Sequence, residues 1–227
     1  MTAAAARIAL IHATPLAVEP VRAAFERLWP QARRMNLLDD SLSVDHAEAG
    51  RLTDAMVQRF ITLARYAQGT GAQAILFTCS AFGPAIEEAG RATSLPTLKP
   101  NQAMFDDALA LAQPGRTLKL GLLATFQASI PSMAQELQQL AGARGIALDL
   151  RTAFVPQAMD DLAAGRPGDH HRKIAQAANA LAGCDAVMLA QFSMAAAAPE
   201  AQAQLPCPVL SSPDCAVRAL MQTMRDA

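Results

Sequence analysis

Short apolar runs alternate along the chain with longer segments whose apolar residues recur every three or four positions. The short runs are flanked by turn-forming residues, a pattern typical of strands buried on both faces of a parallel sheet. The longer segments are typical of amphipathic helices, as in 52–67, where Leu52, Met56 and Phe60 share one face. Similar helical patterns occur at 101–112, 130–140, 171–181 and 214–224. Strands that alternate with helices predict an α/β fold with right-handed connections between parallel strands.

The apolar runs also repeat with a constant spacing. Each of three blocks in the first half has a counterpart 112 positions later, the pairs being 7–14 with 119–125, 71–77 with 183–189, and 96–99 with 208–211. A weaker block at 35–38 falls on 147–150. A constant register over three blocks indicates two copies of one unit. We therefore predict two pseudo-symmetric lobes, 1–114 and 115–227, each a four-stranded parallel sheet flanked by helices, with the C-terminal helix able to pack on the first lobe.

The loops that follow the predicted strands are rich in hydroxyl and amide side chains. Ligands of open parallel sheets bind beyond the carboxyl ends of the strands, so two facing lobes predict a site in the cleft between them. Free backbone N–H groups at helix starts suit a small carboxylate, although the same residue types are also ordinary helix caps. The predicted substrate-binding residues are His12, Thr14, Thr78, Ser80, Asn101, Thr125, Gln127, Gln191, Ser193 and Ser211.

Cys79 is the predicted catalytic residue. It follows the apolar run at 74–77 and precedes a predicted helix that begins near Gly83. A thiol at the start of a helix has a lowered pKa, which favours the reactive thiolate. Free cysteine is also a common small core residue, and we assign that role to the other three, Cys184, Cys207 and Cys215. The four lack a CxxC pair and a histidine at ligand spacing, so we expect free thiols and no structural metal.

Composition excludes several classes of protein. Apolar residues make up 52% of the chain and charged residues 17%, which is too apolar for a disordered chain. No apolar run reaches the roughly 18 residues of a membrane span. The net charge is −1 with no basic cluster, and aromatic residues are 4%, which disfavours nucleic-acid binding. The N-terminal segment lacks the features of a signal peptide, so we expect a cytoplasmic protein.

The repeat, the segment Phe77-Thr-Cys-Ser80 and the segment Gly121-Leu-Leu-Ala-Thr125 together resemble the aspartate/glutamate racemase superfamily. This superfamily includes amino-acid, hydantoin and allantoin racemases, arylmalonate decarboxylase and maleate cis-trans isomerase. The resemblance covers nearly the whole chain. It implies a small carboxylic-acid substrate, no cofactor, and two cysteines that face each other across the cleft. One removes the α-proton and the other reprotonates the opposite face, and the resemblance places the first at Cys79.

The sequence departs from this pattern at the second cysteine. The spacing of the repeat places Gln191 there, and an amide is neither a base nor a useful proton donor near neutral pH. The decarboxylase branch also uses one cysteine, but carries it in the second half. Three hypotheses remain: Cys79 protonates a carbanion or enediolate; Cys79 attacks an activated double bond or carbonyl as a nucleophile; or the protein is a catalytically silent small-carboxylate binding protein.

The histidines offer a weaker signal. His12 ends the first predicted strand, where it is either a helper base or a packed residue. His170 and His171 fall in the charged run 166–173, which predicts a solvated loop that opens a helix. A papain-like site fits less well because it does not account for the repeat, and an extracytoplasmic binding protein would carry an export signal. The sequence leaves the oligomeric state open, a homo-oligomer included.

Overall fold

The structure is a computed structural model that describes residues 5–226, and it divides into two compact units. The first unit runs to Gln102 and also includes the chain from Ala216 onward; the second is 103–215. The sequence expectation placed the boundary at 114/115, whereas these units change at 102/103. As a result, helix α5 (Gln102–Leu109) belongs almost entirely to the second unit, and most of helix α10 (Ser212–Asp226) belongs to the first.

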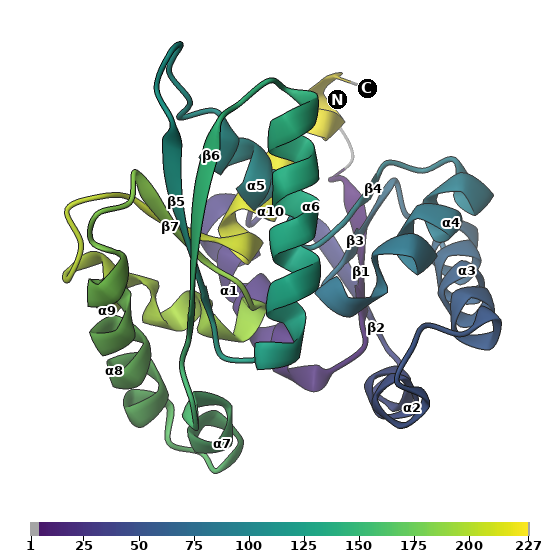
Figure 1. Cartoon of the computed structure of the whole chain (residues 1–227). Helices are drawn as coiled ribbons and strands as arrows, with labels where there is room; N and C mark the ends of the chain where they lie inside the picture. The colour runs from purple at the N-terminus through teal and green to yellow at the C-terminus, as the bar shows by residue number, and fades with distance from the viewer. Residues whose placement is uncertain (1–4, 227) are drawn as a thin grey trace. The chain divides into compact units, whose positions relative to one another are not determined.

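The first unit is built on a parallel sheet with the strand order β2-β1-β3-β4. Its strands are β1 (Arg7–His12), β2 (Arg33–Leu38), β3 (Ala74–Phe77) and β4 (Thr97–Leu98). Its helices are α1 (Val18–Leu28), α2 (Ser41–Ala49), α3 (Asp54–Gly69) and α4 (Gly83–Thr93), with short 3-10 turns η1 (Pro15–Ala17) and η2 (Ser80–Phe82). Helices α3 and α4 lie side by side (Figure 1). All four residues of β3 are buried, so the central strand ends inside the unit's core.

The second unit has a parallel sheet with the equivalent order, β6-β5-β7-β8. Its strands are β5 (Leu118–Ala124), β6 (Leu148–Phe154), β7 (Ala186–Leu189) and β8 (Val209–Ser211). Besides α5 it holds α6 (Ile130–Ala143), α7 (Ala158–Ala163), α8 (Pro167–Ala178) and α9 (Ala198–Gln202), with 3-10 segments η3 (Gln127–Ser129), η4 (Asn179–Leu181) and η5 (Phe192–Ala197). The predicted pair of four-stranded parallel sheets flanked by helices is therefore confirmed.

The central strand pairs β1–β3 and β5–β7 share their register as well as their place in the strand order. Ile8 lies opposite Ala74 in the first sheet, and Leu120 lies opposite Ala186 in the second, so both strands keep the spacing of 112. The expectation for the weaker block was wrong. Asn36 lies opposite Leu10, whereas Thr152 lies opposite Leu122, so β6 is displaced by 116 and not 112 positions. Helix α6 has 14 residues where α1 has 11, which lengthens this connection.

The charged run at 166–173 is not the solvated loop that its composition predicts. Helix α8 begins at Pro167, one residue into the run, and its first turns contain His170 with no exposed surface. Both ring nitrogens of His170 lack a hydrogen-bond partner, and burial is the main cause that lowers the pKa of His170 to about 4. Periodicity explains the difference, because His170 occupies the same buried face as Ile174 and Ala178.

Candidate active site

Cys79 lies at the carboxyl end of β3, between the last strand residue and the start of η2. Its backbone is extended at the N-cap position of η2. Hydrogen bonding from the backbone of Ala81, within η2, and from the side chain of Ser43 acts to lower the pKa of the thiol. Of the four cysteines, Cys79 is half-buried and the other three are buried. Among these thiols, Cys79 is therefore the accessible one.

The expectation that this position lowers the thiol pKa is wrong. Burial raises the pKa of Cys79 above its ordinary value, and the hydrogen bonds from Ala81 and Ser43 offset this only in part. The helix-start argument counted the favourable backbone dipoles and omitted the cost of placing a thiolate in a poorly solvated site. Cys79 is consequently a protonated thiol near neutral pH, which suits a proton donor better than a resting nucleophile.

His12, the last residue of β1, hydrogen-bonds to Thr78, the residue before Cys79. Its Nδ1 lies 2.9 Å from Thr78 Oγ1, and its Nε2 lies 3.0 Å from Asn36 Oδ1. An amide oxygen only accepts, so Nε2 carries the ring hydrogen and Nδ1 accepts from the Thr78 hydroxyl. Burial lowers the pKa of His12, and the bond to Asn36 opposes that shift. With 1% of its surface exposed and both nitrogens engaged, His12 orders Thr78 and is not placed to bind substrate itself.

Helix α2 contacts Cys79 and the following turn η2, at one point on each. The Ser43 hydroxyl, which contacts the thiol, donates a hydrogen bond of 2.5 Å to the Ala13 carbonyl at the end of β1. The ring of His46 packs edge-on against Phe82, the last residue of η2, with ring centroids 5.0 Å apart. Residues of η2 and α2 thus hydrogen-bond the thiol that follows β3.

In the second unit, the position equivalent to Cys79 carries an amide whose polar atoms are engaged. Gln191 Oε1 accepts hydrogen bonds from the Thr125 backbone N–H at 2.8 Å and from the Thr125 hydroxyl at 3.2 Å. Gln191 Nε2 donates to Ser129 Oγ at 2.9 Å, and Ser129 donates to the carbonyl of Phe126. This amide joins the ends of β5 and β7 within the unit, so it has a structural role there.

The remaining predicted residues lie at strand ends with varied surroundings. Thr14 caps η1, where its hydroxyl accepts from the Leu16 N–H at 3.4 Å. Ser193 lies in η5 and contacts the sulfur of Met159 at 3.9 Å. The others are Ser80, half-buried as the first residue of η2; Asn101, buried beside α5; Gln127, exposed as the first residue of η3; and Ser211, buried as the last residue of β8.

Four residues of these networks were missed by the sequence reasoning. Asn36 is exposed on β2, Ser43 lies on a short polar helix, and Ser129 and Ala81 lie in 3-10 turns. Asn36 carried a weak signal, since it is the one amide in the segment Met35-Asn-Leu-Leu38. Ser43 carried none, because a serine in the segment 41–49 reads as a solvated helix residue.

No group of three or more histidine, cysteine, aspartate or glutamate side chains within residues 5–226 is arranged to hold a metal ion. No helix within the same range is both long enough and apolar enough to cross a membrane.

Solved structures of several racemases and a decarboxylase share this fold. A glutamate racemase isoform from Bacillus anthracis matches with a TM-score of 0.71 at 15% identity, covering 97% of this chain and 82% of that one. Allantoin racemase from Klebsiella pneumoniae matches with a TM-score of 0.70 at 16% identity, covering 97% and 88%. Unliganded arylmalonate decarboxylase matches with a TM-score of 0.60 at 17% identity, covering 96% and 92%.

Comparison with the curated proteins gives no match. The profile of the Asp/Glu/Hydantoin racemase family, in contrast, matches residues 13–220, which is nearly the whole chain. The matched range contains Cys79 at the end of β3 and Gln191 at the end of β7. The resemblance inferred from the repeat and the strand-end segments is therefore confirmed, and this chain belongs to the Asp/Glu/Hydantoin racemase family.

Proposed function

We propose that the protein is a cofactor-independent isomerase or lyase that acts at the α-carbon of a small carboxylic acid through one thiol, that of Cys79. The observation that carries this proposal is the contrast within a racemase-family chain between two strand ends. At the first, a half-buried thiol contacts two hydrogen-bonding groups. At the equivalent second position, the Gln191 amide is engaged inside its own unit and offers no proton carrier.

The raised thiol pKa defines the direction of the proposed proton transfer. In the lyase direction, the C–C bond from the α-carbon to a second carboxylate breaks and CO2 leaves. The electron pair that remains at the α-carbon, as a planar carbanion or enediolate, takes the proton of the Cys79 S–H. The S–H bond breaks as the C–H bond forms, leaving a thiolate. The hydrogen bonds from the Ala81 backbone and the Ser43 side chain stabilise that thiolate. A proton from solvent then restores the thiol. In the isomerase direction, the thiolate removes the α-proton by the reverse step.

The hydroxyl side chains that follow the strands are the proposed ligands of the substrate carboxylate. Ser80 follows the thiol directly and is half-buried at the start of η2. Thr78 precedes it and is fixed by its hydrogen bond to His12. The Ser80 hydroxyl is suited to donating to a carboxylate next to the thiol, while Thr78, whose hydroxyl proton goes to His12, orders the chain before Cys79. We propose the second-unit residues Thr125, Gln127, Ser193 and Ser211 as further candidates.

Hydrogen exchange provides the direct test. The protein is incubated in deuterated water with a panel of small carboxylic acids that have an acidic α-hydrogen or a second carboxyl group, and products are followed by NMR. We expect exchange or decarboxylation with at least one acid. Cys79→Ser should lower the rate about 100- to 10,000-fold, and Cys184→Ser, a change at a buried cysteine, should not. Equal rates for the wild type and Cys79→Ser would refute the proposal.

The second candidate is a small-carboxylate binding protein without turnover. The engaged amide of Gln191 favours it, because that side chain stabilises the second unit where a two-thiol enzyme would have a reacting group. The same NMR samples separate the two functions. A binding protein would shift or broaden the resonances of one acid, while the α-hydrogen signal of that acid would keep its full intensity.

A further inference from the structure

Helix α2 contributes a side chain that hydrogen-bonds the Cys79 thiol from outside the β3–η2 segment, namely Ser43. The helix has nine residues, and only Leu42 among them is buried. A helix of this length is marginal by itself, and one apolar side chain anchors it weakly. Other contacts must therefore hold α2 against the rest of the unit.

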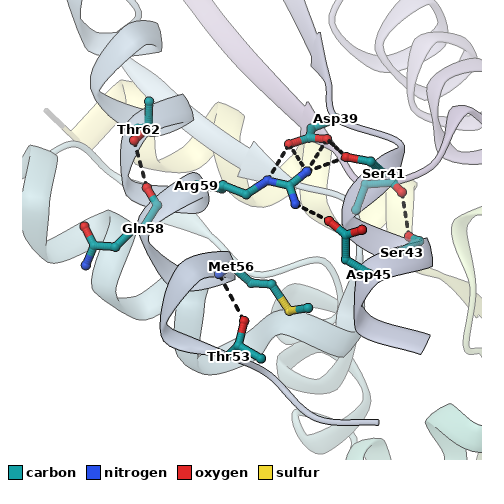
Figure 2. Close-up of polar contacts among 10 residues, drawn as sticks. Asp39, Ser41, Ser43, Asp45, Thr53, Met56, Gln58, Arg59 and Thr62 are labelled. Carbon is teal, nitrogen blue, oxygen red and sulfur yellow. Dashed lines mark hydrogen bonds and ion pairs between the residues drawn. The ribbon is translucent and has the colours of Figure 1, made fainter. Parts of the chain in front are cut away.

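Arg59 on α3 makes those contacts (Figure 2). Its Nε lies 3.0 Å from Asp39 Oδ2, and its Nη2 lies 2.6 Å from each oxygen of the same carboxylate. Nη2 also lies 2.5 Å from Ser41 Oγ, while Nη1 pairs with Asp45. Asp39 precedes α2, and Ser41 and Asp45 are part of it, so Arg59 binds the chain on both sides of Ser43.

The charges of this network are matched and partly shielded from water. The side chains of Arg59 and Asp39 are 32% and 25% exposed. Although burial raises the pKa of Asp39, the hydrogen bonds and charge of Arg59 hold it below its ordinary value. A bidentate arginine–carboxylate pair of this kind also fixes orientation, which a single point contact would not.

We propose that Arg59 is a positioning residue for Cys79: by holding Asp39, Ser41 and Asp45 it sets α2 at the distance where the Ser43 hydroxyl meets the thiol. The proposal takes from the proposed function only that Cys79 is the reacting group. In the structure, the Ser43 hydroxyl donates to the Ala13 carbonyl at 2.5 Å, and the hydrogen bonding between Ser43 and Cys79 favours the thiolate. When the thiol ionises, a turn of the hydroxyl redirects its proton to the sulfur.

The pH dependence of Cys79 alkylation tests this without any substrate. Full-length variants react with iodoacetamide over a range of pH, and peptide mapping gives the rate at Cys79. We expect Ser43→Ala to raise the midpoint of the profile by about one pH unit, and Ser43→Thr to restore it. Arg59→Gln should move the midpoint in the same direction. The titratable groups on β1 and α2, which are Arg7, His12, Asp45, His46 and Glu48, are unchanged in all variants.

The double variant Ser43→Ala/Arg59→Gln distinguishes an effect of Arg59 that acts through Ser43 from one that acts on the thiol independently of Ser43. If Arg59 acts through Ser43, the double variant has the same midpoint as Ser43→Ala alone. Additive shifts, or no shift with Arg59→Gln, would overturn the proposal. Arg91→Gln on α4, where Arg91 pairs with Glu88, is the matched control and should leave the profile unchanged. If the Arg59→Gln variant unfolds, Arg59→Lys is measured in its place, since lysine keeps the positive charge but cannot form the bidentate contacts of a guanidinium group. Because alkylation needs no turnover, its result is independent of the exchange experiment.

Discussion

The ends of β3 and β7 have the same place in equivalent sheets, yet they carry opposite chemistry. After β3 the side chain is a half-buried thiol with two hydrogen bonds, and after β7 it is an amide with three. The first leaves a transferable proton at the surface of its unit, whereas the second uses its polar atoms to join two strands. A shared fold therefore preserves the location of a site without preserving its reactivity.

The helices beside these strand ends show a parallel difference. In the first unit, Arg59 of α3 reaches two carboxylates that flank Ser43 on α2. In the second unit, one carboxylate meets two cations. Asp161 of α7 pairs with Lys173 of α8 and with Arg166, which lies just before that helix. Lys173 and Arg166 hold the pKa of Asp161 below its ordinary value. Each unit fastens its short helix by ion pairs to the helix that follows, but the numbers are reversed: two carboxylates share one cation in the first unit, and one carboxylate shares two cations in the second.

Gln191→Cys is the change that would most directly remove the difference between the strand ends. With one thiol, turnover delivers a proton to one face of a planar intermediate, and we expect a single enantiomer. A second thiol should supply the opposite face, so the variant should lose optical purity on an acid that the wild type exchanges. Chiral chromatography of the deuterated product measures this. A product as optically pure as that of the wild type would show that a thiol at 191 does not reach the substrate.

The same substitution has a cost in stability. Without the amide, the Thr125 N–H and the Ser129 hydroxyl lose their partner at Gln191. We expect the free energy of unfolding to fall by about 1–3 kcal/mol, the usual effect of leaving a buried polar group unsatisfied. Urea denaturation gives the value, and Gln127→Cys at an exposed position is the matched control.

A second comparison sets His170 against His12. Both have a lowered pKa, but His12 has two hydrogen-bond partners and His170 has none. Below pH 6.5 the unfolded chain binds a proton at residue 170 that the folded chain, with a pKa of about 4, does not. Stability is therefore fully present above pH 6.5 and falls towards pH 4, by about 3 kcal/mol from this residue.

His170→Leu isolates that contribution. The substitution removes two unsatisfied nitrogens and the titrating group, so the urea midpoint should vary less between pH 7 and pH 4.5 than in the wild type. Gln176→Leu, at an exposed position of the same helix, is the control, because it leaves both histidines in place. If both variants keep the wild-type pH dependence, His170 is not the group responsible.

The smallest expected effect compares Gly121 with Ala9, its equivalent on β1. A Cβ at 121 would lie 3.0 Å from Leu181 Cδ1 and 3.2 Å from Val187 Cγ2. We expect Gly121→Ala to lower the free energy of unfolding by about 1–2 kcal/mol through overpacking. The reciprocal change, Ala9→Gly, should lower it by about 1 kcal/mol through backbone entropy and lost packing. Thermal and urea unfolding of both variants measure the difference; equal stability of Gly121→Ala and wild type would contradict the packing argument.

The sequence predicted the central strands best. β3 and β7 are short, apolar and followed by turn residues. Such runs are typical of strands buried on both faces of a sheet, and every residue of both strands is buried. The sequence pattern does not predict the register of β6, because a helix can lengthen between two strands without changing the hydrophobic pattern of either strand. The same holds for His170, where the charged neighbours at 166–173 hid a single buried position that helical periodicity selects.

The sequence predicts where the candidate site lies but not the direction in which the pKa of its thiol shifts. Cys79 follows from its place after an apolar run, but the sign of its pKa shift depends on how many groups surround it once the chain is folded. Ser43 and Arg59 lie 36 and 20 positions from Cys79, on helices whose polar residues look solvent-facing in the sequence. Contacts between distant polar residues have no periodic signature, so only the structure brings them together.

The protonated state of Cys79 also bears on how the protein survives oxidants. Peroxides attack thiolates, and the rate follows the fraction of thiol that is ionised. Burial keeps that fraction small at Cys79, while the other three cysteines are buried from solvent. The same feature that favours proton donation over resting nucleophilicity thus makes the thiol slow to form a sulfenic acid, and the protein should retain its four free thiols during storage in air.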